Sequence, residues 1–514
     1  MTSSMPSIVL QYFGLAIAGG LFSLGFAPFG WWPLPLLTLA ILFVCFNTAN
    51  KKQSFIMGLC FGLGQFGVGV SWVYVSMVNF GNMSPVLAVV AVILMTVFLA
   101  CYPALAALSF TLLKSGSKIF NLIFLAPACW VLWEALRSHL FTGFPWLLAG
   151  YSSIDSWLVG YAPIGGVVML SLLTCLIAGL VGLAFSGFSR TDVVRSFGPL
   201  IVIAFLFGVG AILKSIQWTK PTGQELTVGM VQLDVPLGLK WQEGMQDQIM
   251  RSYIDASQSL EEGVDLLIWP EGALPQFYHQ MSATVRESIE RLKPALVFGS
   301  LERRELGNEV LVHNSMVLLD GEQLEGKREQ IYRKYHLVPF GEFFPLEWLL
   351  TDLLAQLQVP MSNMTSWYGK QPYLSSKGFN WLPTICYEDA FPEDWRASIP
   401  NATAILNISE DAWFGDSFAP HQRLEMGRMR SIETGREMVR VSNSGLSTVV
   451  RVDGSYDQIT PQFEAVILSD KVNGYQGETP YVKWGQLPVY MSLFIILLFR
   501  LFCFNSKYNR RNKH

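Results

Sequence analysis

The distribution of charge along the chain constrains the fold more than any other feature. Of the 514 residues, 51% are hydrophobic and only 15% are charged, which is less charge than a soluble protein of this length carries. Charged residues are sparse in residues 1–214, frequent in 215–485 and almost absent from 486 to 499. We therefore predict a membrane domain at 1–214, a water-exposed domain at 215–485, and a C-terminal membrane helix with a short tail at 486–514.

Eight apolar segments are candidates for membrane-spanning helices, because a helix needs about 20 mostly apolar residues to cross a bilayer. They are residues 8–29, 32–48, 54–76, 84–113, 119–135, 162–187, 196–214 and 486–503. The first has neither Lys nor Arg before it and no clear small-residue cleavage site, which favours a retained helix over a removable signal peptide. The prediction is an α-helical transmembrane domain of about eight spans, seven of them before the water-exposed domain.

Positive charges in short loops indicate the side of the membrane on which each loop lies, since Lys and Arg are enriched on the cytoplasmic side. Such charges follow the second, fourth, sixth and eighth segments: Lys51, Lys52, Lys114, Lys118, Arg190, Arg195, Lys507, Arg510, Arg511 and Lys513. The alternate loops are nearly bare of charge. Residues 215–485 follow the seventh segment, so we expect them on the outer face of the membrane.

The cysteines are distributed just as unevenly. Six lie in or beside the apolar segments: Cys45, Cys60, Cys101, Cys129, Cys175 and Cys503. Cys386 alone lies in the water-exposed domain, so on the oxidising side of the membrane it is either buried and inert or kept for its chemistry. The net charge of -3 and the lack of a long basic run argue against nucleic acid as a partner.

Short β-rich runs bounded by turn residues recur through the water-exposed domain. They are residues 226–233, 264–270, 295–300, 314–320, 382–387, 404–409, 438–443 and 447–452. Residues 241–262, 281–292 and 421–436 carry apolar residues at the three-to-four spacing of helices. Strands that alternate with helices predict an α/β layered fold.

One apolar stretch, residues 343–367, does not fit that pattern, because it holds many large apolar side chains and few charges. Its composition fits an ordinary core helix. Because predicted spans tether the domain on both sides, we also expect that it could be an apolar flap that dips into the bilayer surface beside the active site. Gly341 and Gly369 are candidate hinges for such a flap.

A carboxylate follows the apolar run Leu266-Leu267-Ile268-Trp269-Pro270-Glu271. Loops at strand ends often present functional groups in α/β folds. Glu271 is therefore a candidate general base. A solvated loop acid would produce the same motif, and the motif alone does not separate the two.

A lysine and a second acid occur in the run Tyr332-Arg333-Lys334-Tyr335-His336-Leu337-Val338-Pro339-Phe340-Gly341-Glu342. An ammonium near a thiolate or an oxyanion stabilises the negative form of either. Lys334 is thus a candidate for that role, with a surface lysine as the alternative. Glu342 is a candidate acid that orients it.

A cysteine follows another apolar strand, in Pro383-Thr384-Ile385-Cys386-Tyr387-Glu388-Asp389. A thiol is strongly nucleophilic, but with an ordinary pKa near 8.5 it needs a base or a cation nearby. A small buried hydrophobe is the structural alternative for Cys386. A Cys–His dyad is a competing way to activate it, and His336 and His421 lie nearest to the motifs. The sequence contains neither His-Glu-x-x-His nor Cys-x-x-Cys, so we expect no metal site.

Taken together, Pro270-Glu271, Tyr332-x-Lys334 and Cys386-Tyr387-Glu388 resemble the nitrilase (carbon–nitrogen hydrolase) superfamily, which carries a Glu, Lys, Cys triad in that chain order. The resemblance implies an αββα sandwich for residues 215–485. With spans before and after this domain, the whole chain resembles the membrane branch of the superfamily, the apolipoprotein N-acyltransferase family.

Further motifs extend this resemblance over nearly the full length. They are Asp411-Ala412-Trp413-Phe414-Gly415-Asp416, Pro420-His421-Gln422, Arg428-Met429-Arg430, Phe26-Ala27-Pro28-Phe29, Ser71-Trp72 and Thr142-Gly143-Phe144-Pro145-Trp146. Glu410 departs from the family pattern, where Asn is usual, and Ala419 departs where Gly is common. These departures put the local loop geometry in doubt.

The resemblance implies a two-step ping-pong reaction in the bacterial inner (cytoplasmic) membrane, with the catalytic domain on the periplasmic side and no cofactor. Glu271 would take the proton of Cys386, whose sulfur attacks an ester carbonyl of a glycerophospholipid. Lys334 and a backbone N–H such as that of Tyr387 would stabilise the oxyanion. The resulting thioester would acylate the N-terminal amine of a diacylglyceryl apolipoprotein. The resemblance assigns supporting roles to Glu342, Tyr387 and Glu388, and we expect Trp241 to line the apolar substrate site.

Two alternatives remain open at the level of sequence. A membrane-tethered nitrilase-type amidase would use the same triad with water as the acceptor; the predicted spans and the apolar stretch at 343–367 favour transfer, because a small soluble substrate requires neither. A transporter or scaffold with an inactive outer domain predicts that Cys386→Ser leaves function unchanged.

Overall fold

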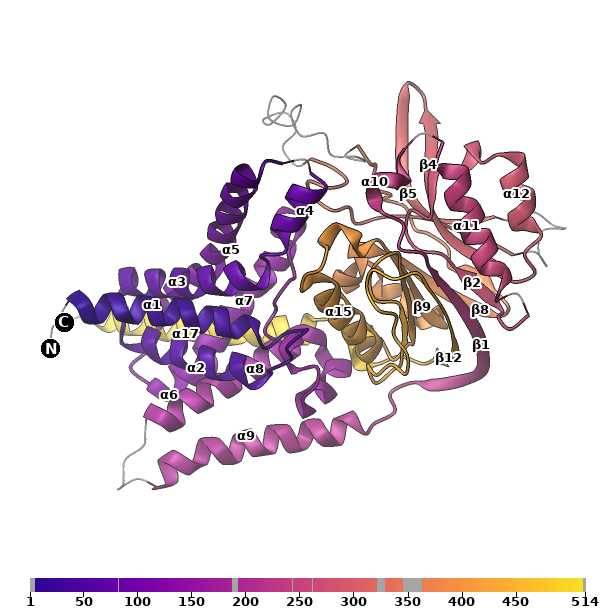
Figure 1. The fold of residues 1–514 in the computed structure, drawn as a ribbon. Helices are drawn as coiled ribbons and strands as arrows, with labels where there is room; N and C mark the ends of the chain where they lie inside the picture. The colour runs from indigo at the N-terminus through magenta and orange to yellow at the C-terminus, as the bar shows by residue number, and fades with distance from the viewer. Residues whose placement is uncertain are drawn as a thin grey trace. The chain divides into compact units, whose positions relative to one another are not determined.

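The chain forms two compact units, drawn in Figure 1. The computed structural model describes residues 5–81, 83–186, 193–242, 244–260, 262–320, 329–344 and 363–511. The helical unit comprises Met1–Tyr74, Pro85–Ile216 and Lys483–His514, and the sheet unit comprises Val75–Ser84 and Gln217–Val482.

Long apolar helices dominate the helical unit. They are α1 (Met5–Ser23), α2 (Pro33–Thr48), α3 (Lys51–Gly69), α5 (Pro85–Leu113), α7 (Ala126–His139), α8 (Ala162–Ser186), α9 (Val193–Lys214) and α17 (Leu487–Arg511), with the short α6 at Lys118–Phe120. Asn50 begins α3 with a reciprocal capping box, in which its side chain accepts from Gln53 N and the Gln53 side chain accepts from Asn50 N.

Within the described residues, four helical stretches are long and apolar enough to cross a membrane: Pro85–Leu113, Lys118–Thr142, Trp157–Phe185 and Phe197–Lys214. A fifth candidate is α3 together with α4 (Val73–Asn79), a pair that is bent by 52°. Shorter apolar helices occupy Ile8–Ser23, Pro33–Thr48 and Leu487–Cys503. The chain therefore has several helices that could span a membrane, and the number of about eight stays a prediction.

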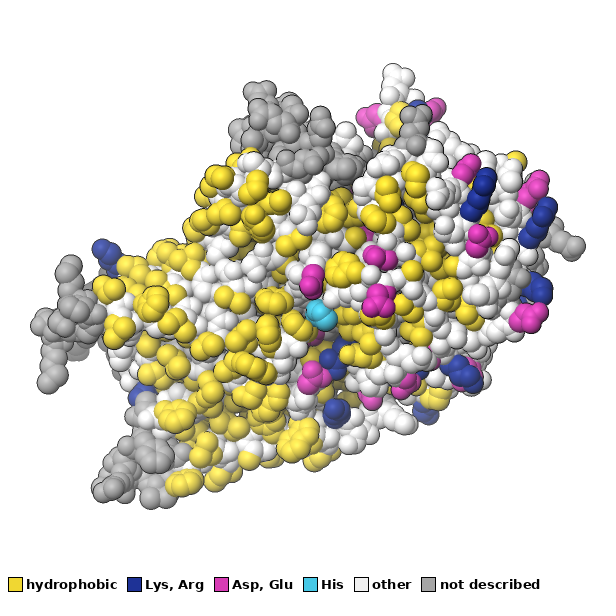
Figure 2. Space-filling view, viewed as in Figure 1, with side chains coloured by type: hydrophobic (Ala, Val, Ile, Leu, Met, Phe, Trp, Pro, Cys, Tyr) yellow, Lys and Arg dark blue, Asp and Glu magenta, His cyan; other side chains and the backbone are white. Residues whose placement is uncertain are grey.

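Glycines let the helices of this unit approach closely. A Cβ atom on Gly58 of α3 would lie 2.4 Å from the carbonyl oxygen of Pro103 in α5, and one on Gly64 would lie 1.8 Å from that of Ala16 in α1. Small residues at such crossings are typical of helix packing in membranes. Many large apolar side chains of this unit are exposed, and Figure 2 shows them gathered on one face, as expected for a surface that contacts lipid.

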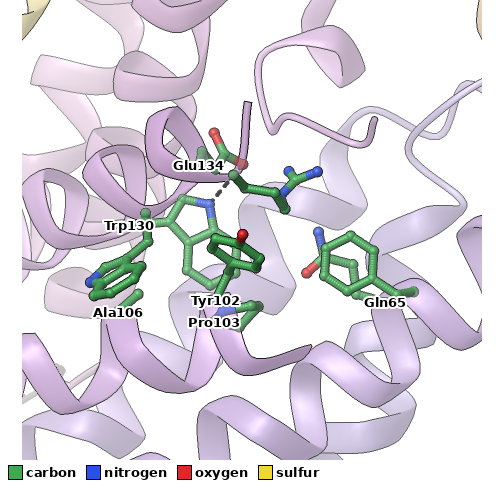
Figure 3. A pocket seen from close by; sticks show the side chains of 9 residues that line it. Gln65, Tyr102, Pro103, Ala106, Trp130 and Glu134 are labelled. Atoms are coloured by element: carbon green, nitrogen blue, oxygen red, sulfur yellow. Dashed lines mark hydrogen bonds between the residues drawn. The ribbon is translucent and has the colours of Figure 1, made fainter. Parts of the chain in front are cut away.

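Glu134 and Arg137 are buried inside the helical unit, where they bind backbone groups and the indole of Trp130. Glu134 Oε1 accepts from Trp130 Nε1 at 3.0 Å and from Ala149 N at 2.9 Å, while Arg137 Nη1 donates to Phe144 O at 2.7 Å. Both side chains line a small cavity, shown in Figure 3. Their contacts with Phe144 O and Ala149 N fix the loop after α7.

The sheet unit is built on two mixed sheets. The seven-stranded sheet has the order β12-β1-β2-β4-β5-β6, with β3 beside β4, and the five-stranded sheet has the order β11-β10-β9-β8-β7. The strands of the first are β1 (Lys220–Gln232), β2 (Leu266–Ile268), β3 (Leu274–Phe277), β4 (Ala295–Leu306), β5 (Glu309–Leu319), β6 (Gln330–Arg333) and β12 (Val466–Gln476). Those of the second are β7 (Leu374–Ser376), β8 (Phe379–Ile385), β9 (Ala404–Ser409), β10 (Met438–Ser442) and β11 (Thr448–Val450).

Three apolar cores lie between the layers of this unit. The central core joins residues from both sheets, such as Met230 of β1 and Leu406 of β9. A second core packs α11 (Gln246–Gln258) and α12 (Ala283–Glu290) on the outer face of the seven-stranded sheet. The third includes Leu424 of α15 (Ala419–Thr434) and Ile405 of the five-stranded sheet. The order of layers is helix, sheet, sheet, helix.

The predicted strands all overlap observed ones, with one local difference that matters for the site. The run 382–387 was expected to stay extended, but β8 ends at Ile385 and residues Cys386–Ala390 form a single 3-10 turn. The short strands β3, β6 and β7 and the long β12 were not predicted. The predicted helix at 241–262 begins later, since α11 starts at Gln246.

Val75–Ser84 packs with the sheet unit although it lies between helices of the other unit in sequence. Ser76 Oγ donates to Trp413 O at 2.7 Å, and the rings of Phe80 and Trp413 meet edge to face with centroids 5.4 Å apart. Trp413 therefore packs against this segment. Most of the predicted flap, residues 345–362, lies outside the described residues.

Candidate active site

Cys386 occupies a strained turn at the end of β8. Its backbone φ is 51°, a conformation that non-glycine residues rarely adopt, and its side chain is buried. Ile385 N donates to Glu388 Oε2 at 2.6 Å, which fixes the turn directly before and after the cysteine. Strand β8 therefore ends directly before Cys386, and the cysteine begins the turn.

Glu388 ties this turn to the loop that carries Lys334. Its carboxylate accepts from Tyr332 Oη at 3.0 Å, from Tyr335 N at 2.7 Å and from His336 N at 3.2 Å. Burial raises the pKa of Glu388 to about 7, while these backbone donors and Lys334 oppose the rise. The predicted supporting residue is therefore a structural link between the two motifs.

Lys334 lies between two acids in the buried interior. Its Nζ atom is 2.9 Å from Glu342 Oε1 and 3.6 Å from Glu271 Oε1. Burial alone would lower the pKa of Lys334, but the charges of Glu342, Glu271 and Cys386 outweigh burial and raise it. The lysine is consequently an ammonium, as its predicted role requires.

Asn314 on β5 binds both acids and fixes their positions relative to each other. Its Nδ2 atom donates to Glu271 Oε1 at 2.7 Å and to Glu342 Oε1 at 2.9 Å. No sequence motif predicted Asn314. It lies in the middle of β5, between the polar residues His313 and Ser315, and no local pattern distinguishes it from them.

Glu271 is placed by the loop after β2 and by a close glycine. Its second oxygen, Oε2, accepts from Glu410 N at 2.9 Å. A Cβ atom on Gly299 of β4 would lie 2.6 Å from Glu271 Cα, so only glycine fits opposite the loop that carries Glu271. Glu271 is thus a fixed, buried carboxylate and not a solvated loop acid.

The departure at Glu410 is explained by a buried partner. Lys240, which ends the short helix α10 (Leu237–Lys240), forms an ion pair with Glu410. Glu410 also accepts from Asn443 Nδ2 at 3.3 Å. Burial raises the pKa of Glu410, and Lys240 opposes the rise. Because the backbone of Glu410 binds Glu271, this pair supports the predicted base.

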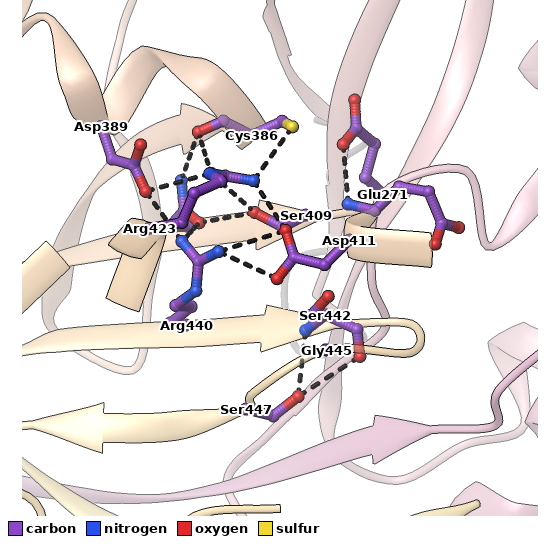
Figure 4. Close-up of polar contacts among 12 residues, drawn as sticks. Glu271, Cys386, Asp389, Ser409, Asp411, Arg423, Arg440, Ser442, Gly445 and Ser447 are labelled. Carbon is purple, nitrogen blue, oxygen red and sulfur yellow. Dashed lines mark hydrogen bonds and ion pairs between the residues drawn. The ribbon is translucent and has the colours of Figure 1, made fainter. Parts of the chain in front are cut away.

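Arg423 of α15 is the hydrogen-bond donor to the Cys386 sulfur, with Nη1 and Sγ 3.2 Å apart (Figure 4). Burial raises the pKa of the Cys386 thiol to about 12; Arg423 and Lys334 oppose the rise, and Glu271 and Asp411 add to it. The resting thiol is therefore protonated and needs a base. Sequence reasoning missed Arg423.

Tyr387 and Trp241 are the remaining predicted residues. The ring of Tyr387 packs against Phe391, with centroids 4.8 Å apart, and Trp241 follows α10 as a half-buried side chain. The ring of His336 stacks on Phe391, and its Nδ1 lies 3.0 Å from Asp394 Oδ2. In the part of the chain that the structure describes, the hydrogen-bond partner of Cys386 Sγ is Arg423 and not His336.

Comparisons with known proteins agree with the sequence resemblance. Two family models match: the apolipoprotein N-acyltransferase N-terminal domain over residues 18–180 and the carbon-nitrogen hydrolase domain over residues 227–473. The apolipoprotein N-acyltransferase of Methylococcus capsulatus is 36% identical over 487 residues, which cover 92% of each chain. That of Vibrio cholerae is 34% identical over 96% of this chain and 97% of its own.

Among solved structures, an amidase of the nitrilase superfamily from Nesterenkonia AN1 is 18% identical, covers 53% of this chain and 98% of its own, and has a TM-score of 0.34. The relatives above 30% identity align with nearly the whole length of this chain, which includes both ranges matched by the family models. The resemblance inferred from the motifs is therefore confirmed, and this chain belongs to the apolipoprotein N-acyltransferase family.

Proposed function

We propose that this acyltransferase moves a fatty acyl chain from a glycerophospholipid to the N-terminal amine of a diacylglyceryl-cysteine lipoprotein, with Cys386 carrying the chain as a thioester. The observation that supports this most is the buried pair of Glu271 and Lys334, 3.6 Å apart, whose charges both influence the pKa of the buried Cys386 thiol. Both residues act electrostatically on the thiol, and each side chain is held by further buried contacts.

In the first step, Glu271 takes the thiol proton as the sulfur attacks the ester carbonyl. The charge that develops on the carbonyl oxygen is stabilised by Lys334 and by a backbone N–H such as that of Tyr387. When the tetrahedral intermediate collapses, the ester C–O bond breaks and Glu271 returns its proton to the leaving glycerol oxygen. A lysophospholipid departs and the acyl group stays on Cys386.

In the second step, the amine of the acceptor attacks the thioester. Glu271 accepts a proton from the amine, the C–S bond breaks, and the proton passes to the sulfur of Cys386. The burial of the sulfur supports transfer over hydrolysis, because a site that excludes water protects the thioester until the amine arrives. Trp241 and the apolar residues 343–367 would extend this exclusion around the acyl chain.

The membrane placement belongs to the same proposal. Both proposed substrates carry fatty acyl groups, and the protein has several helices that could span a bilayer. We propose about eight spans, with the sheet unit on the periplasmic side of the bacterial inner membrane, from the alternation of positively charged loops. The acceptor and the donor would then both reach the site from the bilayer.

The test is a transfer assay with the full-length protein in mixed micelles. Phosphatidylethanolamine with isotope-labelled acyl chains is incubated with a diacylglyceryl lipopeptide, either with a free N-terminus or with an acetylated one. Labelled amide is expected on the free amine alone, together with one lysophospholipid per turnover. Cys386→Ala is expected to abolish it, whereas Cys101→Ala is a matched control that should retain it.

A membrane-tethered amidase would give another result. It would release labelled fatty acid, or hydrolyse small amides, at the same rate with either lipopeptide. That outcome would exclude the acyltransferase mechanism proposed for this site.

A further inference from the structure

Arg423 contacts the reacting atom of the site from an element outside the three predicted motifs. It lies in the first turns of α15, its side chain is 1% exposed, and its Nη1 atom is 3.2 Å from Cys386 Sγ. Its other terminal nitrogen, Nη2, donates to the carbonyl oxygen of Cys386 at 2.6 Å. One guanidinium therefore touches both the sulfur and the backbone of the nucleophile (Figure 4).

Two buried aspartates hold the guanidinium in this position. Nη1 donates to Asp411 Oδ1 at 2.8 Å, and Nη2 donates to Asp389 Oδ2 at 3.1 Å. Arg440 binds the same pair, with Nη1 2.7 Å from Asp389 Oδ2 and Nη2 3.1 Å from Asp411 Oδ2. The planar fork of an arginine suits such a shared arrangement, which fixes the direction in which Arg423 points.

The charges of this cluster leave the arginine able to stabilise an added anion. The aspartates carry two negative charges and the arginines two positive charges, so the four side chains are neutral together. A thiolate at Cys386 would face a neutral cluster with a guanidinium N–H aimed at it. This is a favourable site for one negative charge in a low-dielectric interior.

Lys334, the predicted cation, stabilises a thiolate at Cys386 less than Arg423 does. Its ammonium is shared between Glu342 and Glu271, which together outweigh its charge. Among the groups that act on the thiol, Glu271 and Asp411 disfavour its ionisation, and Arg423 is the largest influence in favour. Once Glu271 holds the thiol proton, Glu342, 2.9 Å away, still neutralises the ammonium of Lys334, whereas Arg423 directs an N–H at the sulfur.

We propose that Arg423 is a catalytic residue of this enzyme, whose guanidinium stabilises the Cys386 sulfur as an anion. This proposal rests on the proposed thioester route. Arg423 would act in both steps of that route. In the first step the sulfur becomes negative as Glu271 removes its proton and it attacks the ester carbonyl. In the second step the sulfur is the leaving group, and the C–S bond breaks as the amine nitrogen bonds to the carbonyl carbon.

The alternative is a positioning role alone, in which Arg423 only holds the turn at Cys386 through the carbonyl oxygen. The two roles differ in how the thiol responds to pH. Loss of a neighbouring cation displaces thiolate formation to higher pH, whereas loss of a structural tie lowers stability without that displacement.

The test is the alkylation rate of Cys386 by iodoacetamide in the full-length protein in detergent, measured by peptide mass spectrometry over a range of pH. No lipid substrate is needed, so the result does not depend on the proposed substrates. Arg423→Gln is expected to slow alkylation at a fixed, near-neutral pH by about 10- to 1000-fold, the effect of removing an opposite charge at this distance. The pH profile should move upward accordingly.

Arg440→Gln is the matched control, because it removes the same charge from the same cluster but not the contact with Sγ. Its effect on the rate should be at least about tenfold smaller than that of Arg423→Gln. Arg423→Lys keeps a cation and should stay within about tenfold of the wild type, which provides a second test should Arg423→Gln not fold. Equal slowing in Arg423→Gln and Arg440→Gln, or a folded Arg423→Lys slowed by more than about 100-fold, would overturn the proposal.

Discussion

The ammonium of Lys334 pairs more closely with Glu342, at 2.9 Å, than with any other acid of the site. Glu342 is in turn fixed by Val338 N, which donates to its second oxygen at 2.8 Å. Because Glu342 takes the short contact, Glu271 lies farther from the lysine, at 3.6 Å. The arrangement leaves Glu271 available to accept a proton while Lys334 stays charged and in place.

Replacing Glu342 should therefore impair catalysis without removing any of the three reacting groups. In Glu342→Gln, Lys334 is expected to move toward Glu271 and neutralise the base. A misplacement of about 1 Å in a catalytic group costs about 100-fold, so kcat/KM should fall by that order. Glu290→Gln, at an exposed position on α12, is the matched control. A Glu342→Gln enzyme with the kcat/KM of the wild type would contradict this account.

Gly299→Ala should disturb Glu271 from the opposite strand. The added Cβ would lie 2.6 Å from Glu271 Cα and 2.6 Å from Gly272 N, and backbone atoms cannot move aside cheaply. We expect a loss of about 1–3 kcal/mol in the free energy of unfolding, together with reduced kcat. Gly263→Ala, which has open space around its Cα, should change neither quantity. Equal unfolding midpoints for the two variants would show that the predicted clash is relieved.

The buried pair of Lys240 and Glu410 should behave as a unit. Lys240→Met leaves the Glu410 carboxylate buried without its cation, which is expected to cost about 3–5 kcal/mol of stability. The double variant Lys240→Met/Glu410→Gln removes the orphaned charge and should recover most of that loss. Thermal or denaturant unfolding of Lys240→Met, Glu410→Gln and the double variant measures the coupling between the two residues. If the stability losses of the two single variants add up to that of the double variant, the residues are not coupled.

Glu388 should make stability depend on pH in an unusual direction. Its pKa in the folded protein is raised to about 7 by burial, whereas an unfolded glutamate titrates near 4.3. Between these values the folded state binds more protons than the unfolded state. The contribution of this group to stability is therefore greatest below about pH 4 and is lost as the pH rises through about 7, by about 4 kcal/mol in total.

The measurement is the difference between the free energies of unfolding at about pH 5 and about pH 7.5, compared between the wild type and Glu388→Gln. The variant cannot ionise at this position, so its stability should fall less across the interval. Absolute stability is not compared, because glutamine also loses an acceptor for Ile385 N. The same pH dependence in both proteins would mean that Glu388 does not titrate in this range.

The sequence predicted the parts of the site that follow strands. Glu271 and Cys386 each follow an apolar strand, and the two sheets that contain those strands share one apolar core. Lys334 and Glu342 belong to one short loop and could be paired from their spacing. The positions of these residues follow from patterns within short stretches of the chain, which can be read from a single sequence.

The residues that sequence analysis missed depend on contacts between distant elements. The helix at 421–436 was predicted from its apolar spacing, but which of its arginines faces Cys386 depends on how the helix sits on the five-stranded sheet. Asn314 and Lys240 meet their partners across strands and loops far apart in sequence. Val75–Ser84 joins the sheet unit through Trp413, a contact between segments more than 300 residues apart that no local pattern signals.

The central claim is that Cys386 carries the acyl group, and intact mass spectrometry of the purified full-length protein tests it most directly. The wild type and Cys386→Ala are incubated with phosphatidylethanolamine in the absence of acceptor, then weighed before and after treatment with neutral hydroxylamine. The account predicts a fatty-acyl increment on the wild type alone, which hydroxylamine removes. An unmodified wild type, with Cys386 still open to alkylation and small amides hydrolysed, would contradict it.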